Sequence, residues 1–188
     1  IQSFFLSSIS ATDVCIGDTT QFTFHSTTTP TSISWDFGDP STGANNVSTL
    51  TNPTHIFSTT GTFTVTATVT VGIEISVITL DVTIYDLPVV TSPVTLIQCD
   101  DDLDGIVDFN LNEANQLIST NHLNETFTYF LLLNDALNNS NSIANPTAFS
   151  NATASTVWAR IENATNCFTT AQVNLQITST SIPPGLMI

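Results

Sequence analysis

The densest group of ionisable side chains is an acidic run just past the middle of the chain. Five of the chain's 16 carboxylates fall within residues 100–108. Carboxylates packed this closely repel one another unless a cation lies among them. The run contains the pattern D-x-D-x-D-G, formed by Asp100, Asp102, Asp104 and Gly105. Alternate residues of such a pattern direct oxygens to one centre while the glycine permits a sharp turn, and hard oxygen donors favour Ca²⁺.

The pattern is the first half of an EF-hand-like calcium loop, and its second half is incomplete. The Ile106 carbonyl and Asp108 would take the seventh and ninth positions, but the twelfth is Leu111 instead of a bidentate Glu. This departure indicates weaker binding or a distant ligand, for which Glu113 is one candidate. The alternative is a solvated acidic loop before a helix, whose N-terminus favours negative charge. The predicted metal ligands are Asp100, Asp102, Asp104, Ile106 and Asp108.

The three cysteines are too few for a disulfide scaffold but allow one bridge and one remaining thiol. Cys99 and Cys167 lie in the same half of the chain, at an expected strand end and just before another strand, so we expect a disulfide between them. The alternative is two separate buried thiols, which an oxidising environment disfavours. A zinc site is excluded because no C-x-x-C occurs and the histidines are scattered at positions 25, 55 and 122.

The charge balance and the motifs exclude several classes of function. Arg160 is the only basic residue against 16 acidic ones, giving a net charge of −15. Nucleic acid is therefore excluded as a partner, and anionic membrane surfaces are disfavoured. No apolar run of about 18 residues could span a bilayer. Because no G-x-S-x-G, phosphate loop or H-E-x-x-H is present, we expect no enzymatic activity.

The composition predicts an all-β chain that holds these groups in place. Hydrophobic residues make up 41% of the sequence, enough for a core, and 34 threonines and 17 asparagines favour strands and turns. Between Gly61 and Val71 apolar residues alternate with threonines, as in a half-buried strand. This strand offers a single row of hydroxyls, which we interpret as an exposed sheet face. Further strands are expected at 4–9, 21–24, 33–37, 75–84, 94–98, 127–132, 155–161 and 171–177, with one helix at 111–118.

Individual side chains in these elements are expected to be structural. Trp35 and Trp158 are both expected to lie in a core. Asp36 and Asp39 are expected to fix turns through backbone hydrogen bonds. Arg160, on one strand face with Glu162, is expected to pair with it.

Prolines divide the chain into two segments. Pro88 and Pro93 cannot donate ladder hydrogen bonds and favour an extended connection. The expected organisation is a β-sandwich at residues 1–86, a linker at 87–93, a second β-sandwich with an acidic loop and one short helix at 94–180, and the start of another linker at 181–188. The absence of an initiator Met before Ile1 leads us to expect a mature or excised piece of a longer protein.

The first segment resembles PKD domains over about residues 4–86. The resemblance rests on the sequence from Trp35 to Asp39, on that from Asn52 to Phe57, and on the following Gly61-Thr-Phe-Thr-Val. It implies an immunoglobulin-like sandwich used outside the cell as a spacer or adhesive module, in which His55 is structural. Relatives often carry a second cysteine where Ile73 stands here, so the resemblance implies that Cys15 is unpaired.

The second segment, about residues 94–178, is similar to repeats of giant surface adhesins of gliding Bacteroidetes, exported by type IX secretion. The similarity rests on Cys99-Asp-Asp, Asp104-Gly, the sequence from Ile143 to Phe149, and Val157 to Glu162 ahead of Cys167. It implies a calcium-associated filament repeat at the cell surface without catalysis. The expected partners are neighbouring repeats of the same polypeptide, with surface glycans and secretion or motility proteins as further candidates.

The chain is thus interpreted as two tandem immunoglobulin-like β-sandwiches from a long extracellular adhesin, stiffened by Ca²⁺. The alternative is an accessory or carbohydrate-binding module of a secreted multidomain hydrolase.

Overall fold

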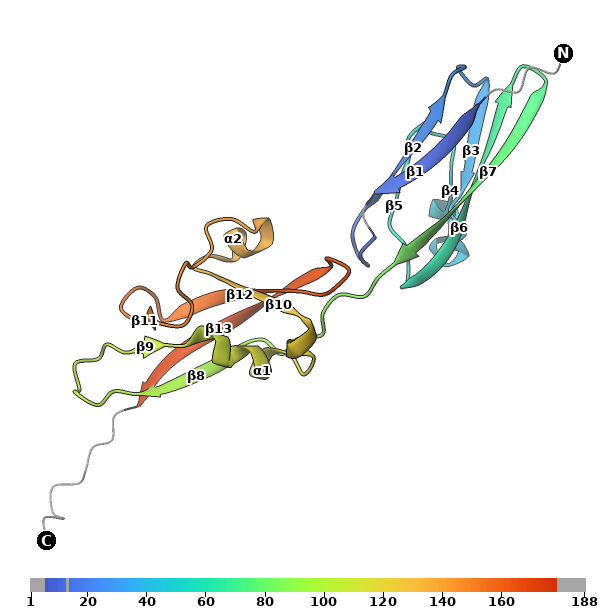
Figure 1. Ribbon diagram of the computed structural model, residues 1–188. Helices are drawn as coiled ribbons and strands as arrows, with labels where there is room; N and C mark the ends of the chain where they lie inside the picture. The colour runs from blue at the N-terminus through green and yellow to red at the C-terminus, as the bar shows by residue number, and fades with distance from the viewer. Residues whose placement is uncertain (1–5, 13, 179–188) are drawn as a thin grey trace, which may run out of the picture. The chain divides into compact units, whose positions relative to one another are not determined.

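The computed structural model describes residues 6–12 and 14–178, and the chain divides between Asp86 and Leu87 into two compact units. We call residues 1–86 the first unit and residues 87–188 the second unit. Both are mainly β (Figure 1). The predicted terminal linker at 181–188 lies outside the described residues. None of the helices in the described part of the chain is long and apolar enough to cross a membrane.

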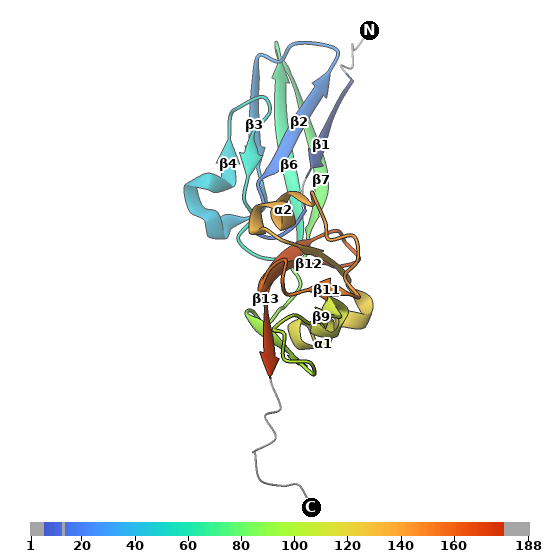
Figure 2. The ribbon, with the colours of Figure 1, turned by 90° about the vertical axis from the view of Figure 1, so that its left-hand side faces the viewer.

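The first unit is a sandwich of two antiparallel sheets. One sheet has the order β1-β2-β5 and the other the order β4-β3-β6-β7. The strands are β1 (Ser7–Thr12), β2 (Thr20–Ser26), β3 (Ser32–Asp36), β4 (Val47–Ser48), β5 (Thr54–His55), β6 (Gly61–Val71) and β7 (Glu74–Ile84), and a 3₁₀ segment at Pro40–Asn46 precedes β4. Figure 2 shows β4 beside β3 at the edge of the larger sheet.

The core of the first unit comes from the apolar half of each alternating strand. Val65, Ala67 and Val69 of β6 are fully buried, while the intervening threonines lie on the outer face. Trp35 of β3 is buried as predicted, and its indole N–H donates to the Leu50 carbonyl oxygen at 2.9 Å. The apolar inner faces of the two sheets pack against each other, and this packing forms the core of the sandwich.

The second unit is built on the sheet β10-β12-β13-β8, in which β8 pairs with β13 in parallel. These strands are β10 (Thr126–Phe130), β12 (Thr156–Glu162), β13 (Phe168–Thr178) and β8 (Val94–Cys99), and a small sheet joins β9 (Asp108–Phe109) to β11 (Phe149–Ser150). The helical segments are 3₁₀ turns at Leu111–Ala114 and His122–Asn124, α1 (Asn115–Ile118) and α2 (Leu133–Asn138).

The predicted helix at 111–118 is confirmed as a helical segment, of which the first turn is 3₁₀ and the second is α1. Asn110 caps it by accepting a hydrogen bond from the Asn112 N–H at 3.2 Å. Leu111, Ala114 and Ile118 are buried in one hydrophobic cluster with residues of the main sheet. The segment therefore covers the inner face of the sheet.

The predicted core position of Trp158 is wrong. Val157, Ala159 and Ile161 are fully buried, so Trp158 lies on the opposite face of β12, where it is half-buried. The alternation along the strand places Trp158 on the same face as Arg160 and Glu162, opposite the apolar face of Val157, Ala159 and Ile161. The outer face is partly covered by α2, whose Ala136 is buried.

Candidate functional site

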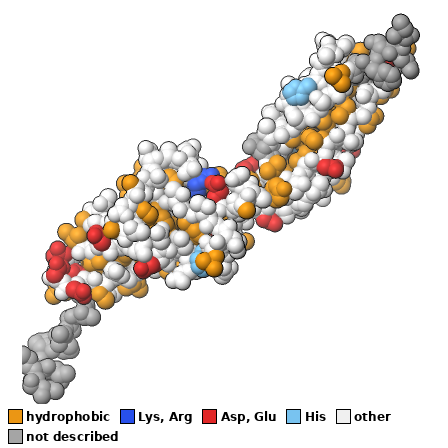
Figure 3. All heavy atoms as spheres, in the orientation of Figure 1, with side chains coloured by type: hydrophobic (Ala, Val, Ile, Leu, Met, Phe, Trp, Pro, Cys, Tyr) orange, Lys and Arg blue, Asp and Glu red, His pale blue; other side chains and the backbone are white. Residues whose placement is uncertain are grey.

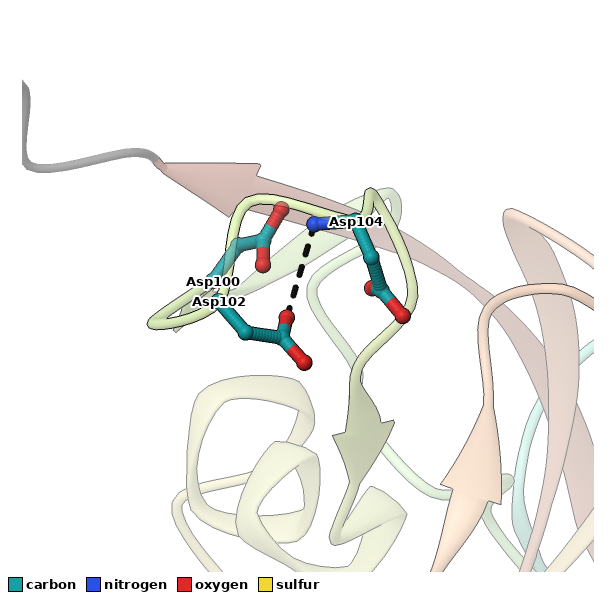
Figure 4. Close-up of side chains that lie close together, drawn as sticks. All are labelled: Asp100, Asp102 and Asp104. Atoms are coloured by element: carbon teal, nitrogen blue, oxygen red, sulfur yellow. Dashed lines mark hydrogen bonds between the residues drawn. The ribbon is translucent and has the colours of Figure 1, made fainter.

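The acidic run forms the loop that joins β8 to β9. Its three carboxylates Asp100, Asp102 and Asp104 face a common centre (Figure 4). One oxygen from each lies within 4.8 Å of one from each of the others. Acidic side chains gather at this end of the second unit (Figure 3).

Backbone N–H groups shape the loop around Asp100. Asp100 is only 4% exposed and its carboxylate accepts hydrogen bonds from the N–H groups of Leu103 and Gly105, each at 2.9 Å. Gly105 adopts φ 82°, where a side chain is disfavoured. Asp104 in turn accepts the Ile106 N–H at 2.7 Å. The sequence therefore folds this loop locally, through carboxylates that bond to backbone a few residues ahead.

Asn151, which the sequence analysis did not connect to this loop, holds its far side. Its amide donates to the Gly105 carbonyl oxygen at 3.0 Å and accepts the Val107 N–H at 2.8 Å. Nothing in the local sequence signals these bonds, since 44 to 46 residues separate the partners.

The donor set fits Ca²⁺ chemically. Two oxygens that bind one Ca²⁺ at about 2.3–2.6 Å lie no more than about 5 Å apart, as the three carboxylates do here. Asp108 does not belong to this group, because it begins β9 opposite Ser150. Ile106 and Glu113 stay predictions as ligands, and Glu113 lies 3.4 Å from the Asn110 amide.

The predicted Cys99–Cys167 disulfide is wrong. Cys99 is a free, exposed thiol, whereas Cys15 and Cys167 are disulfide-bonded, so the expectation of an unpaired Cys15 is wrong as well. The parallel pairing of β8 with β13 is the physical reason. It places Cys99 opposite Thr178 at the far end of β13, while Cys167 precedes the first residue of that strand. At about 3.3 Å per residue the two cysteines are more than 30 Å apart, far beyond the reach of a disulfide.

A buried polar cluster in the first unit surrounds Asp39, which is 1% exposed. Its carboxylate accepts the Ser58 N–H at 2.7 Å and the Ser58 hydroxyl at 2.6 Å, and lies 3.3 Å from Nε2 of His55. Burial alone would raise the pKa of Asp39, but the bonds from Ser58 and the hydrogen bond and charge of His55 together lower it below its ordinary value.

This cluster is structural, although it contains serine, histidine and aspartate. The Ser58 hydroxyl donates to Asp39 and not to His55, so no base is in place to activate it. His55 stacks on Phe37 with ring centroids 4.3 Å apart and meets the edge of Phe57 at 4.6 Å. The cluster therefore ties the chain after β3 to the chain after β5. Asp36 fixes the adjacent turn by accepting the Gly38 N–H at 2.9 Å, as predicted.

The predicted pairing of Arg160 with Glu162 is confirmed, with Nε 3.2 Å from the carboxylate. The guanidinium also lies 3.3 Å from the centroid of Phe168 and donates to the carbonyl oxygens of Ala136 and Leu137 in α2. The single cation of the chain thus holds α2 against the outer face of the main sheet.

Comparisons with known families account for both units. Residues 8–84 match the PKD domain. This confirms the resemblance recognised from the sequence. Residues 95–183 match the Flavobacterium inter-domain disulphide bond domain, which follows the PKD domain directly. The resemblance of the second segment to gliding-adhesin repeats is not confirmed. No curated protein matches the chain.

Several solved structures are similar to the chain. They include the I-band fragment I67–I69 from titin, with 11% identity, 94% of this chain and 65% of that chain covered and a TM-score of 0.40. An E-to-A variant of the same titin domains has 12% identity, the same coverages and a TM-score of 0.38. Three N-terminal domains of the bacteriophage RB49 Hoc capsid protein have 13% identity, coverages of 93% and 59%, and a TM-score of 0.36. The chain spans less than two thirds of each structure.

The chain is a pair of immunoglobulin-like β-sandwich domains, as predicted from the sequence, and domains of this kind are typically non-catalytic. The disulfide-bonded cysteines indicate an extracellular protein, because disulfides persist in oxidising compartments.

Proposed function

We propose that the chain is a non-catalytic structural segment of a long extracellular surface protein, in which a disulfide between Cys15 and Cys167 joins the first unit to the second. One observation carries this proposal. The chain has three cysteines, Cys99 is free and the other two are disulfide-bonded, so each has only the other as a partner within the chain. The description of the family matched by the second unit, an inter-domain disulphide bond domain, supports the same assignment.

Such a bond has a mechanical consequence that follows from covalent connectivity alone. A pulling force applied outside Cys15 and Cys167 passes through the disulfide and bypasses residues 16–166. Those residues then cannot extend, even if both sandwiches unfold. The bond also removes loop-closure entropy from the unfolded chain, which stabilises the fold by about 5 kcal/mol for a loop of this length.

Force spectroscopy on the chain, held by handles at its two ends, tests the proposal. Without reductant, residues 16–166 contribute no extension at any force below rupture of the handles. With reductant, the maximum extension increases by about 500 Å, at about 3.4 Å per residue. Equal extensions with and without reductant would exclude the covalent bypass.

Calcium is the second part of the proposal. Bound at Asp100, Asp102 and Asp104, it would offset the repulsion among the loop carboxylates and stiffen the connection between β8 and β9. Calorimetric titration of the wild-type chain with Ca²⁺ is expected to give heat, and Asp102→Ala and Asp104→Ala are each expected to weaken binding by at least tenfold. Absence of heat from the wild-type chain would end the calcium proposal and leave the disulfide proposal intact.

A more specific version of this proposal is an adhesive role at the surface of a gliding bacterium, with export by type IX secretion. Its support is the sequence resemblance of the second segment and the combination of two modular sandwiches. The rival role is an accessory module of a secreted hydrolase. The sequence that flanks the chain in its gene discriminates the two, because further repeats favour the adhesin and a catalytic domain favours the hydrolase.

A further inference from the structure

The outer face of the sheet β4-β3-β6-β7 carries hydroxyl groups on neighbouring strands. The sequence suggested a single row, formed by the threonines of β6. The strand register adds a second row, because Ser32 lies opposite Thr70 and Ser34 opposite Thr68. On the other side of β6, Thr79 of β7 lies opposite Thr66. The face therefore offers a two-dimensional array of hydroxyls.

Part of this face is hollowed between β6, β3 and the edge strand β4. The cavity has a volume of about 490 Å³, within the range of about 300–1,000 Å³ that is typical of small-molecule sites. It is lined chiefly by Ser34, Asp36, Val47, Thr49, Thr66 and Thr68. A row of opposed residues crosses it, from Val47 through Asp36 to Thr66. All three belong to the outer face of the sheet.

Several hydroxyl groups in the hollow make no hydrogen bond within the described residues and can bind a ligand. Within residues 6–12 and 14–178, the hydroxyls of Thr66 and Thr68 make no hydrogen bond to another residue, nor does that of Ser34. Other hydroxyls of the same sheet are used internally, as in the 2.7 Å bond from Thr64 to Asp81. The hollow thus combines a concave surface with hydroxyls that are available to a ligand.

Asp36 places a carboxylate among these hydroxyls and is held in position. Its Oδ1 accepts the Gly38 N–H and the Asn46 side-chain amide, each at 2.9 Å. Its Oδ2 accepts no hydrogen bond from the described residues. Charge-assisted hydrogen bonds to a carboxylate are about twice as strong as neutral ones, so Oδ2 is the strongest free acceptor of the hollow.

We propose that this hollow binds a neutral oligosaccharide. A fixed carboxylate and several hydroxyls match the hydroxyl groups of a sugar, which both donate and accept, and the Val47 side chain offers an apolar contact to a ring face. The net charge of −15 excludes anionic glycans by repulsion. The inference deepens the adhesive role under Proposed function, on which it rests, by naming the class of ligand and the site.

Titration of the ¹⁵N-labelled full chain with maltohexaose, cellohexaose and mannohexaose tests the site by NMR. At least one sugar is expected to shift the amide resonances of residues 34, 36, 66 and 68 in the first unit, with a dissociation constant of about 1 mM. Tetragalacturonic acid, the anionic comparison, is expected to shift none of them. If no neutral sugar shifts these resonances at about 10 mM, the proposal is wrong.

Variants locate the binding. Thr66→Val with Thr68→Val keeps the shape and β-branching of both side chains and is expected to weaken binding by about 10- to 30-fold. Asp36→Asn is expected to weaken it by about tenfold. Thr79→Val, on the same face but outside the hollow, is the matched control and should leave affinity unchanged. Equal losses for Thr79→Val and the double variant would place binding elsewhere and overturn the proposal.

The sugar titration and the force measurement together distinguish failure of the glycan site from failure of the disulfide proposal. A chain that binds no sugar but still shows the reductant-dependent extension disproves the glycan site alone. A chain that binds sugar in the hollow yet extends equally with and without reductant disproves the disulfide bypass alone.

Discussion

Replacing Asp39 by Asn is expected to destabilise the first unit strongly. The Asp39 carboxylate accepts two hydrogen bonds from Ser58 and contacts His55, in an environment where it is 1% exposed. Bonds to a charged group contribute about 1.5–3 kcal/mol each. Asn keeps one acceptor oxygen but turns an N–H₂ toward the remaining donors, so the free energy of unfolding should fall by about 3 kcal/mol.

The same residue predicts a pH dependence with a definite sign. Because the folded-state pKa of Asp39 lies below its ordinary value of 3.8, its ionised form is favoured by folding. Its contribution to stability is therefore present above the unfolded-state pKa and is lost as the pH falls through the folded-state pKa. The stability difference between wild type and Asp39→Asn should be full at pH 7 and shrink below about pH 4.

Urea denaturation followed by tryptophan fluorescence measures this difference. The chain has two tryptophans, one in each unit, so a Trp158→Phe background leaves Trp35 as the reporter of the first unit. Asp81→Asn is the matched control, because Asp81 is exposed and accepts a single bond from Thr64. The control should change stability by less than about 0.5 kcal/mol.

A loss of less than about 1 kcal/mol for Asp39→Asn would refute the reasoning, since it would mean that the bonds to the buried carboxylate contribute no more than neutral surface bonds. A difference that grows as the pH falls would also refute it, because the sign of the linkage would be reversed.

Two further substitutions probe other contacts. Gly38→Ala would place a Cβ 2.6 Å from the Thr64 carbonyl oxygen, at a residue with φ 70°. Urea denaturation should therefore show a free energy of unfolding that is lower by at least about 2 kcal/mol. An unchanged midpoint would contradict this close approach. Arg160→Met leaves Glu162 without its ion-pair partner and removes the cation from the Phe168 ring. Urea denaturation followed by Trp158 fluorescence should show that the free energy of unfolding of the second unit falls by about 2 kcal/mol. A gain in stability would contradict this prediction, because it would show that the apolar replacement packs better than the ion pair.

The local parts of the structure could be predicted from the sequence. The alternation from Gly61 to Val71 coincides with β6, and its inward residues are the buried ones. The Asp100–Gly105 spacing also predicted which carboxylates meet, because the loop is closed by bonds only three to five residues long. Patterns of this kind can be read from the sequence because the contacts that produce the local geometry lie only a few residues apart.

The features that the sequence did not reveal depend on contacts between distant residues. The parallel pairing of β8 with β13 separates Cys99 from Cys167, and no periodicity in either strand indicates the partner or its direction. Asn151 supports the acidic loop across more than 40 residues of chain. Asp108 was predicted as a ligand from its spacing, and the structure places it in β9, opposite Ser150 and outside the group of Asp100, Asp102 and Asp104.

The disulfide assignment is tested most directly by trypsin. Arg160 is the only Lys or Arg, so trypsin cuts the denatured chain once, into residues 1–160 and 161–188. The Cys99→Ser chain, produced in an oxidising compartment and cut without reductant, is predicted to keep the two fragments linked and to release them on reduction. Two separate fragments before reduction would contradict a Cys15–Cys167 bond and with it the proposed mechanical function.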